Sequence, residues 1–256
     1  MRHIRRNERG QLTIGGHIAV DLAERFGTPL YVYSGDGLVA HYTAFASAVS
    51  ELDCVVHYAV KANSSLGVLG LLAQQGAGAD IVSGGEMKRA LIAGIAPDKI
   101  VFSGVGKTDD EIRAALQAGI AQINAESATE LRHISQIAAE TERQAPVALR
   151  VNVNVDPGSH AKISTGQRST KFGIPVADGE AAMLYHKLCS DPKLIPRGLA
   201  VHIGSQLCEL EPFERAYQEL LALADMLSAE GLDVPMLDLG GGLGVDYEGD
   251  TIPDFE

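Results

Sequence analysis

Residues 78–127 read GADIVSGGEMKRALIAGIAPDKIVFSGVGKTDDEIRAALQAGIAQINAES, and this stretch decides the fold. Three short runs rich in β-forming residues, at 79–83, 100–103 and 122–125, alternate with two helical patterns, GEMKRALIAG and DDEIRAALQAG. Apolar residues recur every three or four positions in each helical pattern, and both patterns end at a glycine, a common helix C-cap. Strands that alternate with helices in this way predict a parallel sheet with helical crossovers.

The same alternation extends outward in both directions. Further strands are predicted at residues 55–60, 147–151, 199–203 and 236–239. The first five strands start 24, 21, 22 and 25 residues apart, close to the repeat of a (β/α)8 barrel of the TIM type. A doubly wound open sheet is the alternative, but its first strand is usually followed by a glycine-rich fingerprint, where this chain has Lys61-Ala62-Asn63. The pattern therefore favours the barrel.

The strand count is one short of a closed barrel. Seven core strands are predicted, and the seventh, MLDLGGG, lies close to the last residue, Glu256. Because a barrel closes only when its last strand pairs with its first, we expect an open barrel with two unpaired edges. Upstream of the first core strand, TPLYVYS (residues 28–34) is predicted to be a strand and residues 39–52 a helix.

Composition restricts the class of protein. The 256 residues are 46% hydrophobic and 21% charged, with a net charge of −12, so the chain is globular and a poor partner for nucleic acid. Three scattered cysteines, Cys54, Cys189 and Cys208, predict neither disulfides nor a zinc site. The start lacks the apolar core of a signal peptide, and no apolar run approaches the ~18 residues of a membrane span. We therefore expect a cytoplasmic protein without a membrane partner.

Catalytic side chains of a β/α barrel lie at the carboxyl ends of its strands. Lys61 follows the first core strand in HYAVKAN, at the mouth of an apolar barrel. Partial desolvation there is expected to lower the pKa of its amine, which suits a Schiff base with an aldehyde cofactor. A solvated lysine at a strand end is the alternative.

Two loops with glycine follow the sixth and seventh strands. In the first, HIGSQ (residues 202–206), His202 is expected to project over a bound ring, and Ser205 offers a hydroxyl to an anion. In the second, consecutive amides can converge on a phosphate, although a tight turn alone would also explain the glycines. These glycines are Gly240, Gly241 and Gly242.

Two charged residues lie within strands. Arg150 ends the fifth strand, where its guanidinium would hold a carboxylate or a cofactor oxygen, or form a strand-end salt bridge. Asp80 lies in the apolar second strand and needs a partner when buried. The histidines show no ligand spacing, so no metal site is predicted.

Together these residues resemble the fold-type III pyridoxal-phosphate-dependent decarboxylases, whose barrel is of the alanine racemase-like type. HIGSQ and KIVFSGVGKTDDE resemble the diaminopimelate branch of that family more than the ornithine-type branch, where HVGSG is more usual. The matching stretches are TPLYVYS, HYAVKANSSLGVL, GADIVSGGE, KIVFSGVGKTDDEI, INAES, LRVNVNVD, HAKISTG, KFGI, HIGSQL and LDLGGGLGVDY.

The resemblance implies a role for each candidate residue. Lys61 would form the Schiff base with pyridoxal 5'-phosphate, and His202 would stack on the pyridine ring of the cofactor. The implied reaction is the loss of carbon dioxide from the D-configured centre of meso-2,6-diaminopimelate, giving L-lysine at the end of lysine biosynthesis, in a homodimer. The remaining cofactor contacts would come from Asp80, Arg150, Ser205, Gly240, Gly241 and Gly242.

The resemblance also implies a division of the chain. Residues 1–34 would belong with a C-terminal β-domain, and residues 35–256 would form the barrel. The family's Glu-Pro-Gly-Arg segment, whose glutamate would pair with the ring nitrogen, is not among the 256 residues, and Val153 stands where the family commonly has proline. We therefore expect the eighth strand and the β-domain to be missing, and activity to need the full-length protein.

Two alternatives stay open at this point. An ornithine, arginine or carboxynorspermidine decarboxylase would use the same cofactor, and HIGSQ argues against it. A pyridoxal-phosphate-binding protein without catalysis is the other, and the retained Lys61 argues against it.

Overall fold

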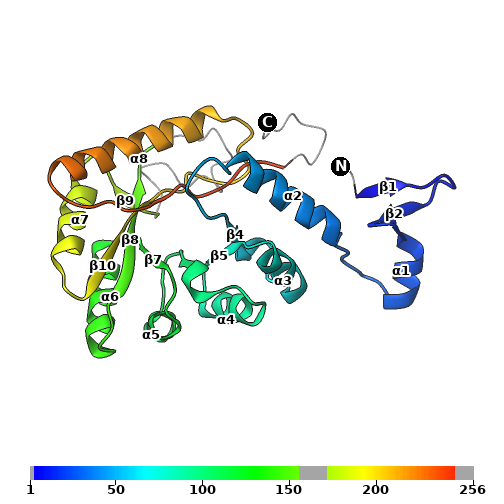
Figure 1. The fold of residues 1–256 in the computed structure, drawn as a ribbon, viewed down its shortest axis with the longest axis horizontal. Coiled ribbons are helices and arrows are strands. Elements are labelled where there is room, and N and C mark those ends of the chain that lie inside the picture. Colours follow the sequence, from blue (N-terminus) through cyan, green and yellow to red (C-terminus); the bar gives the residue numbers. More distant parts are fainter. Residues whose placement is uncertain (1–2, 156–171, 246–256) are drawn as a thin grey trace.

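The computed structural model describes residues 3–155 and 172–245. Its main body is a curled parallel sheet in the order β11-β10-β8-β7-β6-β5-β4, with helices outside it (Figure 1). All seven predicted core strands are present. They are β4 (His57–Ala59), β5 (Gly78–Ile81), β6 (Ile100–Phe102), β7 (Gln122–Ala125), β8 (Ala145–Asn152), β10 (Leu194–Ala200) and β11 (Leu237–Asp238), and a short β9 (Ile174–Pro175) pairs with β8.

The crossover helices begin where the sequence supplies a cap. The side chains of Ser83, Thr108 and Ser127 each accept a hydrogen bond from the amide three residues later. Gly119, with φ of 72°, ends the helix that Thr108 starts. The helices are α2 (Gly35–Ala48), α3 (Leu66–Gln74), α4 (Gly84–Ile92), α5 (Asp109–Ala118), α6 (Ala128–Glu140), α7 (Glu180–Ser190) and α8 (Glu211–Ala229), with 3-10 turns η1 (Val60–Ala62) and η2 (Pro97–Lys99).

Alternation along the strands separates the core from the interior of the barrel. In β8 the apolar side chains of Val147, Leu149 and Val151 belong to the hydrophobic core. Successive side chains of a strand point to opposite faces, so Arg150 and Asn152 lie on the other face. Gln122 and Asn124 alternate with core residues of β7 in the same way. The helices therefore cover an apolar face, and polar side chains collect on the concave face.

One hydrogen bond measures how strongly the sheet curls. Asn124 Nδ2 in β7 donates to Asp238 Oδ2 in β11 at 2.9 Å, although two strands lie between them. In a flat sheet, three strand spacings would hold these residues about 14 Å apart. The predicted β/α barrel is therefore confirmed, as a curled sheet of seven strands whose edges within the described residues are β4 and β11.

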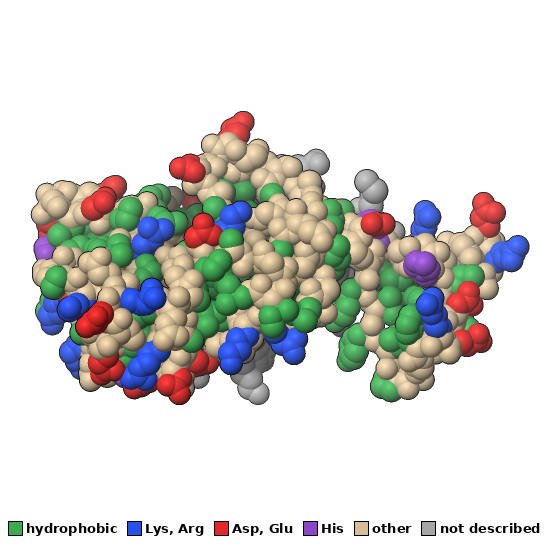
Figure 2. Space-filling model, turned by 60° about the horizontal axis from the view of Figure 1, so that its bottom comes forward, with side chains coloured by type: hydrophobic (Ala, Val, Ile, Leu, Met, Phe, Trp, Pro, Cys, Tyr) green, Lys and Arg blue, Asp and Glu red, His purple; other side chains and the backbone are tan. Residues whose placement is uncertain are grey.

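The N-terminal residues form a separate small unit. It comprises β1 (Ile4–Arg6), β2 (Leu12–Ile14), β3 (His17–Ile18) and α1 (Ala19–Phe26), with antiparallel strand pairs. In the space-filling view this unit projects from the main body, and acidic and basic side chains are interspersed on the face shown (Figure 2). Nowhere in the described parts of the chain is a helix long and apolar enough to cross a membrane.

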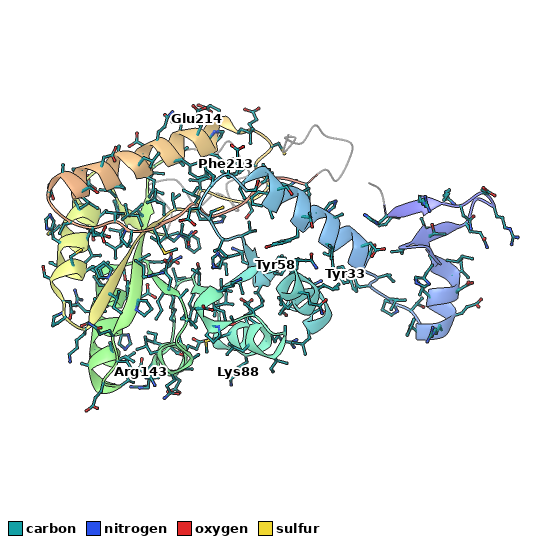
Figure 3. The ribbon with its side chains drawn as sticks, in the orientation of Figure 1. Tyr33, Tyr58, Lys88, Arg143, Phe213 and Glu214 are labelled. Atoms are coloured by element: carbon teal, nitrogen blue, oxygen red, sulfur yellow. The ribbon has the colours of Figure 1, made fainter. Side chains whose placement is uncertain are left out.

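The segment between this unit and the barrel differs from the prediction. The strand predicted at residues 28–34 is wrong, because within the described chain these residues pair with no strand. The alternating aromatics that suggested a strand, Tyr31 and Tyr33, are 87% and 56% exposed (Tyr33 is labelled in Figure 3). The predicted helix is α2, which starts earlier than expected because the side chain of Ser34 accepts from the amide of Gly37.

Candidate active site

Lys61 lies on η1, directly after β4, at the carboxyl end of the sheet. Its positive charge lowers the pKa of both Asp80 and His202, so the three candidates lie close enough to interact. The partial desolvation expected for Lys61 is not seen, because β4 is an edge of the described sheet and the residue is exposed. The buried neighbour on η1 is Val60.

Asp80 brings a carboxyl group into the concave interior of the sheet. Burial raises its pKa from 3.8 to about 6, and the negative charge of Asp238 acts in the same direction. The hydrogen bond from Ser103 and the charges of Lys61 and Arg150 oppose this rise. Asp80 Oδ1 is buried and has no hydrogen-bond partner, so one acceptor of this site is left for another molecule.

The raised pKa predicts how stability depends on pH. The fold favours the protonated acid, so the free energy of unfolding should fall as pH rises from about 4 to about 6, by on the order of 2–3 kcal/mol. Asp80→Asn has no proton to lose, so its stability relative to the unaltered protein should increase across that interval. Urea unfolding of both proteins from pH 4 to pH 8 checks this, and parallel profiles would contradict it.

His202 follows β10, and its ring is held in the neutral form. Burial, together with the positive charges of Arg150 and Lys61, lowers its pKa to about 4. The amide of Gly241 donates to His202 Nδ1 over 3.5 Å. The loop after β10 and the glycine loop after β11 are therefore in contact at the candidate ring-binding residue.

The glycines after β11 are required by the close approach of these two loops. A Cβ on Gly242 would collide with the carbonyl oxygen of Gly204, and one on Gly240 with that of Val201. Their φ angles, 117° and 69°, are also ones that side chains rarely adopt. Leu207 and the segment from 242 to 244 complete the contact through two backbone hydrogen bonds of 2.9 and 2.8 Å.

Amides of the glycine loop differ in what they can bind. The amide of Gly240 already donates to Asp238 Oδ1 at 3.0 Å. A Cβ on Gly241 would meet no described atom within 4 Å, so open space lies beside this residue. The amide of Gly241 donates to His202 Nδ1, so the amide of Gly242 and the hydroxyl of exposed Ser205 are the candidates for holding an anion in this space.

Gln206, the last residue of HIGSQ, fastens the same two loops. Its Nε2 donates to the carbonyl oxygen of Val245 at 2.5 Å, and its Oε1 accepts from the amide of Val245 at 3.1 Å. Its φ is 61°, uncommon outside glycine. Gln206, which distinguishes HIGSQ from HVGSG, therefore holds the two loops together in this structure.

Arg150 has a buried partner that the sequence analysis missed. Its Nη1 donates to Glu126 Oε1 at 2.9 Å, and the side chains of Arg150 and Glu126 are only 9% and 2% exposed. The guanidinium also lies 5.1 Å from the ring centre of Phe172. Glu126 Oε2 is buried without a hydrogen-bond partner. Arg150 therefore forms a salt bridge, one of its two predicted roles, and does so within the candidate site.

Further polar residues of the interior were also missed. Asn124 donates to Asp238 and, at 3.1 Å, to Ser103 Oγ, and it accepts from Gln122 at 2.7 Å. All four lie on strands or just after them, at positions that alternate with core residues. That alternation was the signal available in the sequence.

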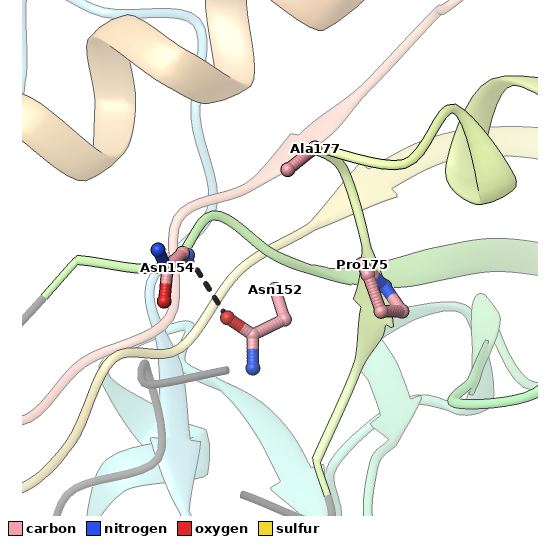
Figure 4. A pocket seen from close by; sticks show the side chains of 4 residues that line it. All are labelled: Asn152, Asn154, Pro175 and Ala177. Carbon is pink, nitrogen blue, oxygen red and sulfur yellow. Dashed lines mark hydrogen bonds between the residues drawn. The ribbon is translucent and has the colours of Figure 1, made fainter. Parts of the chain in front are cut away.

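A small pocket opens beside the end of β8. Its lining residues are Asn152, Asn154, Pro175 and Ala177, and the amide of Asn154 donates to Asn152 Oδ1 at 2.9 Å (Figure 4). Val153, at the position where the resemblance implies proline, is buried. The stretch HAKISTG lies outside the described residues, and among those described no cluster of potential metal ligands occurs.

Comparison with known proteins identifies this arrangement. The family described as "Pyridoxal-dependent decarboxylase, pyridoxal binding domain" matches residues 36–256. Diaminopimelate decarboxylase of Pseudomonas aeruginosa is 50% identical over 232 residues, which are 91% of this chain and 55% of that protein. The predicted resemblance to diaminopimelate decarboxylases is confirmed.

Solved structures agree with the sequence comparison. Diaminopimelate decarboxylase from Helicobacter pylori, complexed with L-lysine, has a TM-score of 0.89 at 40% identity and covers 92% of this chain and 59% of that one. The enzyme from M. jannaschii has a TM-score of 0.93 at 37% identity, covering 99% and 60%. The chain spans a little over half the length of the curated relatives it matches. By its matched residues and its curled sheet alike, the chain belongs to the pyridoxal-dependent decarboxylases and carries their pyridoxal binding domain.

Proposed function

We propose that the protein containing this chain removes carbon dioxide from meso-2,6-diaminopimelate to give L-lysine, using pyridoxal 5'-phosphate. The observation that carries the proposal is that exposed Lys61, buried Asp80 and neutral His202 lie close together beside the glycine loop. The diaminopimelate decarboxylases that resemble this chain, one of them solved with L-lysine, support the substrate.

The residues present fit this cofactor. Asp80 Oδ1 is a buried acceptor without a partner in the interior of the sheet. Beside it, the paired loops present the amide of Gly242 and the hydroxyl of Ser205, donors suited to a phosphate ester. Lys61 supplies an exposed primary amine, the group that reacts with an aldehyde.

Each residue then has a distinct task. Lys61 would hold the cofactor covalently through its amine, and the neutral ring of His202 would stack on the pyridine ring. Ser205 and the amide of Gly242 would bind the phosphate, beside the open space at Gly241. Arg150, oriented by Glu126, would place a positive charge beside the site.

The cofactor, when bound, supplies an electron sink that stabilises the carbanion left by loss of carbon dioxide. Asp80, with its pKa near 6, is able to hold a proton or release it close to neutral pH. Burial of the surrounding polar groups strengthens their electrostatic interactions, because little water screens them.

The test is substrate preference of the full-length protein. We expect release of carbon dioxide from meso-diaminopimelate to be at least about a hundredfold faster than from L-ornithine or L-arginine, a difference of about 2.7 kcal/mol in transition-state binding. Comparable rates on all three would indicate a broader decarboxylase. Bound cofactor without release from any of them would indicate the non-catalytic alternative.

The surroundings of the barrel support further parts of the proposal. Residues 1–34 would belong with a β-domain, because α1 buries none of its side chains and leaves Val20 and Phe26 more than 60% exposed. The full-length protein would act as a cytoplasmic homodimer, consistent with the family resemblance and with free thiols at Cys54, Cys189 and Cys208. Light scattering of the full-length protein measures the oligomeric state.

A further inference from the structure

We infer that Asp238 is a positioning residue for the phosphate group of the cofactor, and this inference rests on the proposed function. Asp238 ends β11, two residues before Gly240, the first residue of the glycine loop. It is not expected to touch the phosphate, since a carboxylate and a phosphate repel each other. Its effect would come from holding the loop.

Both oxygens of Asp238 accept hydrogen bonds, and their partners lie in different parts of the chain. Oδ1 accepts from the amide of Gly240 at 3.0 Å, which fixes the first residue of the loop. Oδ2 accepts from Asn124 Nδ2 at 2.9 Å, which fixes the carboxylate to β7. One side chain therefore ties the glycine loop to the polar interior of the sheet.

Asn124, which anchors Asp238, is itself fixed by further hydrogen bonds. Asn124 accepts from Gln122 at 2.7 Å and donates to Ser103 at 3.1 Å. The residue is only 2% exposed. The backbone carbonyl of Asn124 accepts from Lys107 Nζ at 2.7 Å. Asn124 thus has little freedom to move, and a rigid anchor makes Asp238 able to set the loop's position.

This loop needs such an anchor because β11 is an edge. The strand has two residues and pairs only with β10 among the described strands. With Asp238 in place, the amide of Gly240 donates to the carboxylate and that of Gly241 donates to His202 Nδ1, so the amide of Gly242 is left to face an anion. Without it, the amide of Gly240 becomes free and the turn loses its fixed conformation.

The experiment compares two probes, pyridoxal 5'-phosphate and pyridoxal, on the full-length protein. Both carry the aldehyde, and only the first carries the phosphate. Their dissociation constants are measured by absorbance titration of the unaltered protein, Asp238→Ala, Asp238→Asn and the control Asp233→Asn, an exposed aspartate before β11. For Asp238→Ala we expect the affinity for pyridoxal 5'-phosphate to fall at least about tenfold, or about 1.4 kcal/mol, with pyridoxal changed less than threefold.

Asp238→Asn keeps an oxygen that can accept from Gly240, and reversal of the Asn124 and Gln122 amides can satisfy its new donor. It should therefore recover most of the selectivity for the phosphate, and Asp233→Asn should match the unaltered protein. Equal losses for both probes in Asp238→Ala would overturn the inference. If Asp238→Ala does not fold, Asp238→Ser, which can still accept from Gly240, should lose selectivity partially; full retention would overturn the inference.

Failure of the proposed function gives a different result. In that case the unaltered protein binds neither probe, or binds both without preference for the phosphate. A preference in the unaltered protein that survives in Asp238→Ala leaves the proposed function intact and removes only the role of Asp238.

Discussion

Lys61→Ala is expected to lose the visible absorbance of bound pyridoxal 5'-phosphate and at least about three orders of magnitude in turnover, or about 4 kcal/mol. The reason is chemical, because alanine has no amine to react with the aldehyde of the cofactor. Absorbance spectra and carbon dioxide release of the full-length protein measure both losses. Lys88→Ala, on an exposed face of α4 (Figure 3), is the matched control and should change neither.

Chemical labelling gives an independent check on the same residue. Borohydride reduction followed by peptide mapping should place the cofactor on Lys61. Lys107 is the instructive competitor, since it lies near the site but has a side chain only 1% exposed. Its Nζ donates to the carbonyls of Gly104 and Asn124 and to Glu130, which uses all three donors. A label on Lys107 would remove Lys61 from its proposed role.

Breaking the pair between Arg150 and Glu126 should have the largest effect on stability. Arg150→Met leaves the carboxylate of Glu126 buried without its cation, a change that typically costs about 3–5 kcal/mol. The double variant Arg150→Met/Glu126→Leu removes both charges and should recover most of that loss. Urea unfolding of the two single variants and the double variant measures the coupling, and additive losses would contradict it.

An exposed pair with a similar nitrogen-to-oxygen distance serves as the control. Arg113 Nη2 lies 2.8 Å from Glu140 Oε2, as close as the buried pair, but the two side chains are 35% and 45% exposed. Water screens such a pair, so Arg113→Met should change unfolding little. A larger loss of stability in Arg150→Met than in Arg113→Met would show that the cost comes from burial of the ion pair.

The fold was predictable because the strand–helix alternation is strong and its helix caps agree with it. The exception within the barrel is β10, predicted at 199–203 and found at Leu194–Ala200. Pro196 and Gly198 argue against a strand in sequence, and the structure accommodates them with a shift in pairing between these two residues. A local irregularity of this kind depends on the neighbouring strand, which sequence patterns do not describe.

The candidate site was only partly predictable, for a different reason. Lys61, His202 and the glycines follow strands and carry recognisable chemistry. Glu126 and Asp238 act through partners that are distant in sequence, and only the curl of the sheet brings Asp238 to Asn124. Their signal, a polar residue beside a core position, is too common to assign a role alone.

The curl also has a mechanical consequence. Lys61 follows β4 and the glycine loop follows β11, the two free margins of the described sheet. A small molecule bound at one end by Lys61 and at the other by the glycine loop would link those two margins. Its binding free energy would then add to the resistance of the sheet against opening, so occupancy of the site and integrity of the barrel would rise and fall together.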